Sequence, residues 1–135
     1  MQGTPTVYLL NSNSMGISWL DSTGDGYGQL HKALAANGLS QKLMIDASHA
    51  NSSKKPENQV PVCADIAAQV AGGDDRIIGV MVESHLVAGR QDLMPGKELT
   101  YGQSITDGCI DWDSSLQVLD GLADAVRKRR LAKMD

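Results

Sequence analysis

The chain has 135 residues, which suit one ordinary domain but fall well short of the roughly 250 that a complete eight-stranded (β/α) barrel needs. Hydrophobic residues make up 41% and charged residues 21%, and no apolar run approaches the roughly 20 residues of a membrane span. The net charge of -4 argues against nucleic acid as a partner, because nucleic-acid binding depends on basic surface. We therefore expect a globular protein that binds a small metabolite, with no membrane partner.

The N-terminus and the cysteines favour a cytoplasmic protein. Met1 is followed by polar residues, without the basic and long apolar segments of a secretory signal. The two cysteines, Cys63 and Cys109, lie in different predicted elements and form no C-x-x-C pair. We expect free thiols in a reducing compartment.

Composition changes near residue 28. Residues 1–27 are rich in Gly, Ser, Thr and Asn and contain no Lys or Arg. Within them, residues 6–10 predict a short strand and residues 21–28 predict a loop. The glycines of this loop match neither phosphate-binding pattern, G-x-x-x-x-G-K-S/T or G-x-G-x-x-G, so we expect a plain flexible loop.

Alternating helices and strands are predicted next. Helical spacing predicts a helix over residues 29–37, which the pair Asn37-Gly38 ends. A short apolar run predicts a strand over residues 42–46, and its end opens into the polar loop 48–58.

The middle of the chain carries the clearest helix and the clearest strand. Residues 60–71 place Val62, Ile66 and Val70 on one helical face and are followed by two glycines. The β-branched run 77–82 predicts the strongest strand in the chain.

The last part of the chain begins with a long polar stretch that contains Gly89, Pro95 and Gly96. Residues 103–106 predict a short strand, and Asp113-Ser114 predicts the cap of a closing helix that runs through Val126. The order helix, strand, helix, strand, loop, strand, helix is typical of part of a parallel α/β architecture.

Three polar side chains follow the predicted strands: His49, Glu83 and Asp107. The ends of parallel strands meet at one edge, so these side chains are candidates to converge. A histidine with two carboxylates suits a divalent cation of the Mn, Fe, Co or Zn group, which can polarise a carbonyl oxygen.

Each of these residues also has a plainer interpretation. A histidine in a Ser-rich loop is more often a solvated or capping side chain, Glu83 could form a salt bridge, and Asp107 before a glycine could form a turn. Cys109 could be a further ligand, although a buried inert thiol is the simpler interpretation. The basic run 127–130 fits a solvated helix end better than a nucleic-acid site.

Three segments carry a resemblance to a known family: IDASHANSSK at 45–54, GVMVESHL at 79–86 and SITDGCI at 104–110. Together they closely resemble the C-terminal part of class I 3-deoxy-7-phosphoheptulonate synthase. The resemblance runs nearly without interruption from about residue 43 to about residue 130. Residues 1–27 do not resemble the family, so we divide the chain into this N-terminal segment and a barrel-like part, residues 28–135.

The resemblance implies an α/β fold that is a partial (β/α)8 TIM barrel, with the last strands and helices only. It implies a transferase of the shikimate pathway that condenses phosphoenolpyruvate with erythrose 4-phosphate. His49, Glu83 and Asp107 fall on the family's metal-ligand positions. Asp107 would also lie near the hydroxyls of the sugar phosphate, and Lys54 would bind a phosphate or a carboxylate.

Other family features have no counterpart in this sequence. They are the fourth metal ligand, a cysteine from an early strand, and a Lys-Pro-Arg-Thr segment that belongs to the phosphate-binding part. The alternative interpretation is therefore a catalytically inactive C-terminal fragment that at most binds a metal or associates with itself. Under either interpretation we expect a homo-oligomer that covers the unpaired sheet edges.

Overall fold

The structure is a computed structural model that describes residues 8–10 and 25–134. Nine helices and strands follow one another along these residues, three of which have only two or three residues. In chain order they are β1 (Tyr8–Leu10), α2 (Asp25–Ala36), β2 (Leu43–Asp46), the 3-10 helix η1 (Pro56–Asn58), α3 (Gln59–Ala71), β3 (Ile77–Met81), β4 (Val87–Arg90), β5 (Gln103–Ser104) and α4 (Trp112–Ala132).

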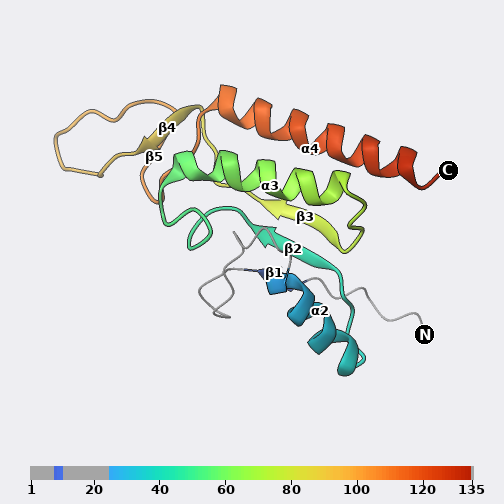
Figure 1. The fold of residues 1–135 in the computed structure, drawn as a ribbon. Coiled ribbons are helices and arrows are strands. Elements are labelled where there is room, and N and C mark those ends of the chain that lie inside the picture. The colour runs from blue at the N-terminus through green and yellow to red at the C-terminus, as the bar shows by residue number, and fades with distance from the viewer. Residues whose placement is uncertain (1–7, 11–24, 135) are drawn as a thin grey trace, which may run out of the picture.

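A parallel sheet with the order β1-β2-β3 forms the base of the fold (Figure 1). β2 is its central strand, and the last rung of the β2-β3 ladder pairs Asp46 with Met81. One further backbone bond, from Ala47 N to Met81 O at 2.9 Å, closes the ladder. The segments that follow β2 and β3 therefore begin at the same edge of the sheet.

Helices α3 and α4 lie side by side, with α3 next to the sheet (Figure 1). The predicted helical face is confirmed, because Val62, Ile66 and Val70 are all buried in the core. They pack in one cluster with the fully buried Leu43 and Ile45 of β2. Parallel strands with apolar side chains that pack under a helix are the arrangement that the alternating pattern predicts.

A second small region joins the sheet to α4. β4 and β5 form a two-stranded parallel pair, and the long loop between them extends away from the helices (Figure 1). Beyond it, the chain returns to the end of β3, where Ser84 and Ile110 form a parallel bridge. Ile110 N donates to Glu83 O at 3.0 Å, so the segment after Asp107 is fixed against the segment after β3.

The structure corrects two predictions near the termini. Residues 25–28 form the first turn of α2 and not a loop, although they contain two glycines. The cap of α4 is Asp111, whose side chain accepts from Ser114 N at 2.9 Å, and not Asp113-Ser114. The remainder of the predicted loop, residues 21–24, and residues 6–7 of the predicted first strand lie outside the described residues.

Two further corrections concern the polar stretch before α4. It contains the strand β4, which no hydrophobic pattern predicts because three of its four residues are exposed. The strand predicted over residues 103–106 ends at Ser104, whose hydroxyl accepts from Thr106 N at 3.1 Å and turns the chain out of the strand.

Mixed helix and strand with parallel pairing agrees with the predicted α/β class. Among the described residues the sheets are small and do not close.

Both cysteines are free, and burial raises the pKa of the Cys63 thiol to about 11, which makes it unreactive. None of the described helices is both long enough and apolar enough to cross a membrane.

Gly121 lies inside α4, where a Cβ atom would meet no neighbouring atom within 4 Å. We predict that Gly121→Ala raises the free energy of unfolding by roughly 0.5–1 kcal/mol, because alanine loses less conformational freedom in a helix. Urea unfolding followed by circular dichroism measures the change. Gly38→Ala is the matched control, because Gly38 has φ of +64° and equal free space, so the same change should destabilise the chain. A loss of stability in the Gly121 variant would contradict the prediction.

Candidate metal centre

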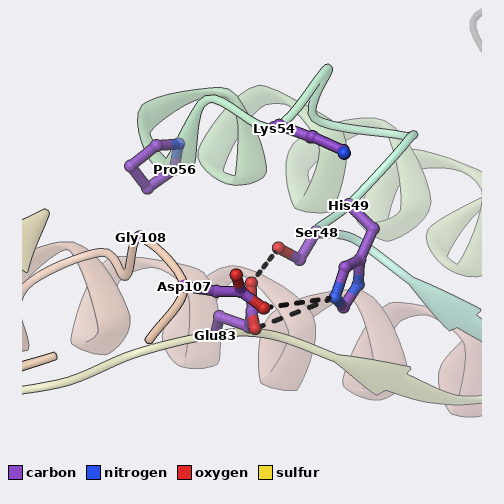
Figure 2. Close-up of a pocket in the computed structure, with 7 residues that line it drawn as sticks. All are labelled: Ser48, His49, Lys54, Pro56, Glu83, Asp107 and Gly108. Atoms are coloured by element: carbon purple, nitrogen blue, oxygen red, sulfur yellow. Dashed lines mark hydrogen bonds and ion pairs between the residues drawn. The ribbon is translucent and has the colours of Figure 1, made fainter. Parts of the chain in front are cut away.

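Three side chains meet at the carboxyl edge of the sheet (Figure 2). His49 follows β2, Glu83 follows β3 and Asp107 follows β5. The Nε2 atom of His49 lies 3.9 Å from Glu83 Oε1 and 3.9 Å from Asp107 Oδ2. One potential ligand atom from each residue lies within 4.8 Å of the other two. The predicted convergence of these three residues is therefore present in the structure.

His49 is oriented by the strand that precedes it. Its Nδ1 atom lies 2.8 Å from Oδ2 of Asp46, a carboxylate that is only 2% exposed. The Asp46 carboxylate accepts a hydrogen bond from the Nδ1–H group, which leaves the Nε2 lone pair facing Glu83 and Asp107. The pKa of His49 is raised, chiefly by this hydrogen bond to Asp46 and against a smaller effect of burial.

The backbone of the turn after β2 is strained where it carries the site. His49 has φ of 47°, in the left-handed region that a residue with a side chain rarely adopts. Ser48 N donates to Asp46 Oδ1 at 2.9 Å, and Lys54 N donates to His49 O at 2.7 Å. These bonds hold the turn in the conformation that directs His49 toward the carboxylates.

Glu83 is held at both its side chain and its backbone. The Ser48 hydroxyl donates to its Oε2 atom, which leaves Oε1 to face His49 (Figure 2). The side-chain amide of Gln59 bonds to the Glu83 backbone N–H and C=O at 2.8 and 3.1 Å. The carboxylate is 23% exposed, so it faces the hollow without being fully solvated.

Asp107 is the most open of the three, because its side chain is 70% exposed. The next residue, Gly108, runs close to the loop before α3, since a Cβ at Gly108 would lie 3.1 Å from Cγ of Pro56. Glycine at this position lets the Asp107 loop approach the loop that carries Lys54.

The donor set fits a divalent cation. One imidazole nitrogen and two carboxylates are ligands that Mn, Fe, Co and Zn accept, and the Asp46 carboxylate behind the imidazole is the usual orienting partner of a metal-bound histidine. Separations of 3.9 Å are only slightly wider than the roughly 3.0–3.5 Å between neighbouring ligands around such ions. Small rotations of these partly exposed side chains would bring them onto one ion.

Comparison with known proteins identifies the family. The sequence pattern of the family described as DAHP synthetase I matches residues 27–120, which is more than half of the chain. The chain belongs to the DAHP synthetase I family.

Named relatives of this family are similar to the chain over most of its length. It is 53% identical over 102 residues to the Phe-sensitive phospho-2-dehydro-3-deoxyheptonate aldolase of Escherichia coli K12, which covers 76% of the chain and 29% of that protein. It is 59% identical over 90 residues to the phospho-2-dehydro-3-deoxyheptonate aldolase of Haemophilus influenzae, which covers 67% of the chain and 25% of that protein. The chain thus spans under a third of the length of these relatives.

A solved structure supports the fold. The phospho-2-dehydro-3-deoxyheptonate aldolase from Francisella tularensis SCHU S4 superimposes on 78% of the chain with a TM-score of 0.73 and 43% sequence identity, and 30% of that protein is covered. The described sheet and helices therefore have the arrangement of a DAHP synthetase I family member.

The His49 imidazole and the carboxylates of Glu83 and Asp107 border a hollow of about 240 Å³ (Figure 2). Lys54, the other residue that the sequence singles out, lines the same hollow and adds a basic side chain to it. The turn conformation of Lys54, with φ of 59°, places it there.

Cys109 and His85, which lie close to the three residues along the chain, do not join the centre. Cys109 is buried, as expected, and its thiol donates to the backbone oxygen of Asp107 at 3.6 Å, while burial raises its pKa. The group of potential ligands found among the described residues contains no cysteine. His85 is exposed and its Nδ1 accepts from Leu86 N at 2.8 Å, away from the residues that line the hollow.

The residues that orient the three candidate ligands were not predicted from the sequence. Asp46 stands three residues before His49 at the end of a strand, and this spacing could have suggested the pair. Ser48 is one of several serines in its loop, and Gln59 looks like an ordinary helix residue. Neither had a local signal, because its partner Glu83 is 35 or 24 residues away.

We predict that Asp46→Asn lowers the pKa of His49 in the metal-free chain, because the amide cannot stabilise the imidazolium as the carboxylate does. The folded pKa of His49 lies above its usual 6.5, so its contribution to stability is full below that pH and is lost as the pH rises through the raised pKa. Nuclear magnetic resonance titration of the imidazole protons measures the shift. Asp120→Asn, an exposed substitution on α4, is the control. An unchanged His49 pKa in the Asp46 variant would contradict the pairing.

Proposed function

We propose that this chain carries the metal-binding part of a 3-deoxy-7-phosphoheptulonate synthase site. The reaction condenses phosphoenolpyruvate with erythrose 4-phosphate to 3-deoxy-D-arabino-heptulosonate 7-phosphate and phosphate, the first step of aromatic amino-acid biosynthesis. The observation that carries the proposal is the convergence of His49, Glu83 and Asp107 from three separate segments at one edge of the sheet. Family membership supplies the identity of the reaction.

In this proposal His49, Glu83 and Asp107 bind a divalent cation of the Mn, Fe, Co or Zn class. When bound, the ion supplies Lewis acidity that polarises the aldehyde oxygen of the sugar phosphate. Asp46 holds the imidazole tautomer with Nε2 free, and Ser48 fixes the rotation of the Glu83 carboxylate.

Lys54 and Asp107 contact the substrates. The hollow that both residues line has the volume for a small metabolite, and the Lys54 ammonium gives it a partner for a phosphate or carboxylate group. Asp107 is open to solvent, so its second oxygen is free to accept a hydrogen bond from a sugar hydroxyl. A small anionic substrate therefore suits this hollow better than a macromolecule does.

We further propose that the three-stranded sheet is part of a (β/α)8 barrel, with the barrel-like part at residues 28–135. Parallel pairing, helices after the strands and polar side chains at the carboxyl ends of strands support this architecture. Among the described residues the sheet remains open, which leaves strand edges for association.

We predict that Glu83→Gln lowers the affinity for Mn²⁺ by at least about 100-fold, because a neutral amide is a poor ligand for this ion. Isothermal titration calorimetry on the full chain measures the affinity. Glu98→Gln is the matched control, since Glu98 is exposed and lies far along the chain in the β4–β5 loop. Equal Mn²⁺ affinity in the two variants would contradict the role of Glu83.

The same variants separate metal binding from catalysis. Metal-dependent consumption of phosphoenolpyruvate with erythrose 4-phosphate that the Glu83 variant loses would mean that copies of this chain assemble a complete site. Mn²⁺ binding without turnover would limit the chain to metal binding and favour the catalytically inactive interpretation.

We predict that the purified chain is a homo-oligomer, because open sheet edges and exposed apolar side chains are stabilised by association. Light scattering with size-exclusion chromatography measures the mass against the 14.4 kDa of one chain. A mass of one chain across the micromolar range would contradict the prediction.

A further inference from the structure

Gln59 is a polar side chain in an unusual position. It is the first residue of α3 and is fully buried, with an exposed fraction of 0%. Both polar ends of its amide are used on one residue, because Oε1 accepts from Glu83 N at 2.8 Å and Nε2 donates to Glu83 O at 3.1 Å. A buried amide is tolerated only where it is hydrogen-bonded, and here both bonds go to the same peptide segment.

The two bonds from Gln59 take the place of the backbone hydrogen bonds that β2 makes with β3 further back along the ladder. The β2-β3 ladder ends at Met81, so Glu83 lies beyond the last rung that β2 provides. A peptide just past a strand end has a free N–H and C=O, which solvent or a side chain must satisfy. Gln59 satisfies both, as the backbone of an adjacent strand would, and so extends the fixed part of the segment to Glu83.

The same contact reaches the second carboxylate. The Glu83 carbonyl that Gln59 bonds also accepts from Ile110 N at 3.0 Å. Ile110 lies three residues after Asp107, and its own carbonyl accepts from His85 N at 2.9 Å. The Glu83 peptide is thus the point at which α3, the end of β3 and the Asp107 loop are joined.

We propose that Gln59 is a positioning residue for the metal centre, which holds the Glu83 backbone so that its carboxylate faces His49. This inference rests on the proposed function, in which Glu83 is a metal ligand. A merely structural Gln59 would contribute to stability alone. A positioning Gln59 sets the affinity for the cation as well.

The test compares three full-length variants at a temperature at which all are folded. Gln59→Met keeps the side-chain volume and removes both hydrogen bonds, and Gln59→Glu keeps an acceptor for Glu83 N but loses the donor to Glu83 O. Val62→Ala removes buried apolar volume one turn further along α3 and touches no ligand, so it is the control for lost stability. We expect both Gln59 variants to bind Mn²⁺ about 10–100-fold more weakly and the Val62 variant to keep the wild-type affinity.

Amide hydrogen exchange at Glu83 gives a second readout that needs no metal. The Glu83 N–H should exchange faster in Gln59→Met than in Val62→Ala, because only the former loses its acceptor. If the Met variant fails to fold, the Mn²⁺ affinity of the Glu variant tests the inference instead, because that variant loses the donor to Glu83 O.

The outcomes distinguish the inference from the function on which it rests. Wild-type affinity in a folded Gln59 variant would overturn the positioning role and leave the proposed metal site intact. A wild-type chain that binds no Mn²⁺ would overturn the metal site. Amide exchange at Glu83 would then decide whether Gln59 holds the Glu83 backbone. Faster exchange of the Glu83 N–H in Gln59→Met than in Val62→Ala supports this role, and equal exchange in the two variants overturns it.

Discussion

The parallel pairing of β2 with β3 is the constraint on which the rest of the site depends. Its last rungs, Asp46 with Met81 and the bond from Ala47 N to Met81 O, bring two strand ends to the same edge. The strands themselves are stabilised by burial of apolar side chains under α3, so the position of the edge is determined in the core. His49 and Glu83 need only a short segment each to extend from this edge toward one another. If one strand slipped by one residue against the other, its side chains would move to the other face of the sheet. The polar residues after the two strands would then face opposite sides.

Around that edge the protein buries polar groups in pairs. Asp46, Ser48 and Gln59 are all buried, and each has a hydrogen-bond partner in the site, the His49 imidazole or part of Glu83. Such groups are costly to bury without partners, so the native arrangement is strongly preferred over alternatives that break a pair. The left-handed backbone at His49 adds strain that these bonds offset. The result is a set of candidate ligand atoms that these hydrogen bonds hold in a fixed orientation.

The electrostatics of the centre favour a cation. Asp46, Glu83 and Asp107 place three carboxylates around one imidazole, and all three raise the pKa of His49. The raised pKa of His49 means that these carboxylates favour a proton on the imidazole, which would offset part of their negative charge. A divalent ion bound at Nε2 would replace that proton and bring a larger positive charge, which Glu83 and Asp107 would share. Lys54, which lines the same hollow, would provide positive charge for an anionic substrate.

Local patterns in the sequence determined much of this protein. The apolar runs at β2 and β3, the helical face of Val62, Ile66 and Val70 and the glycines after α3 follow from side-chain period and backbone preference, which act over a few residues. The three segments with His49, Glu83 and Asp107 were also visible, because each polar residue lies within three residues of the end of a strand. Tertiary structure alone decided that the exposed residues of β4 form a strand and that Gln59 holds Glu83. These features depend on which distant groups the folded chain brings together, and a hydrogen bond across 24 residues leaves no mark on the residues next to either partner.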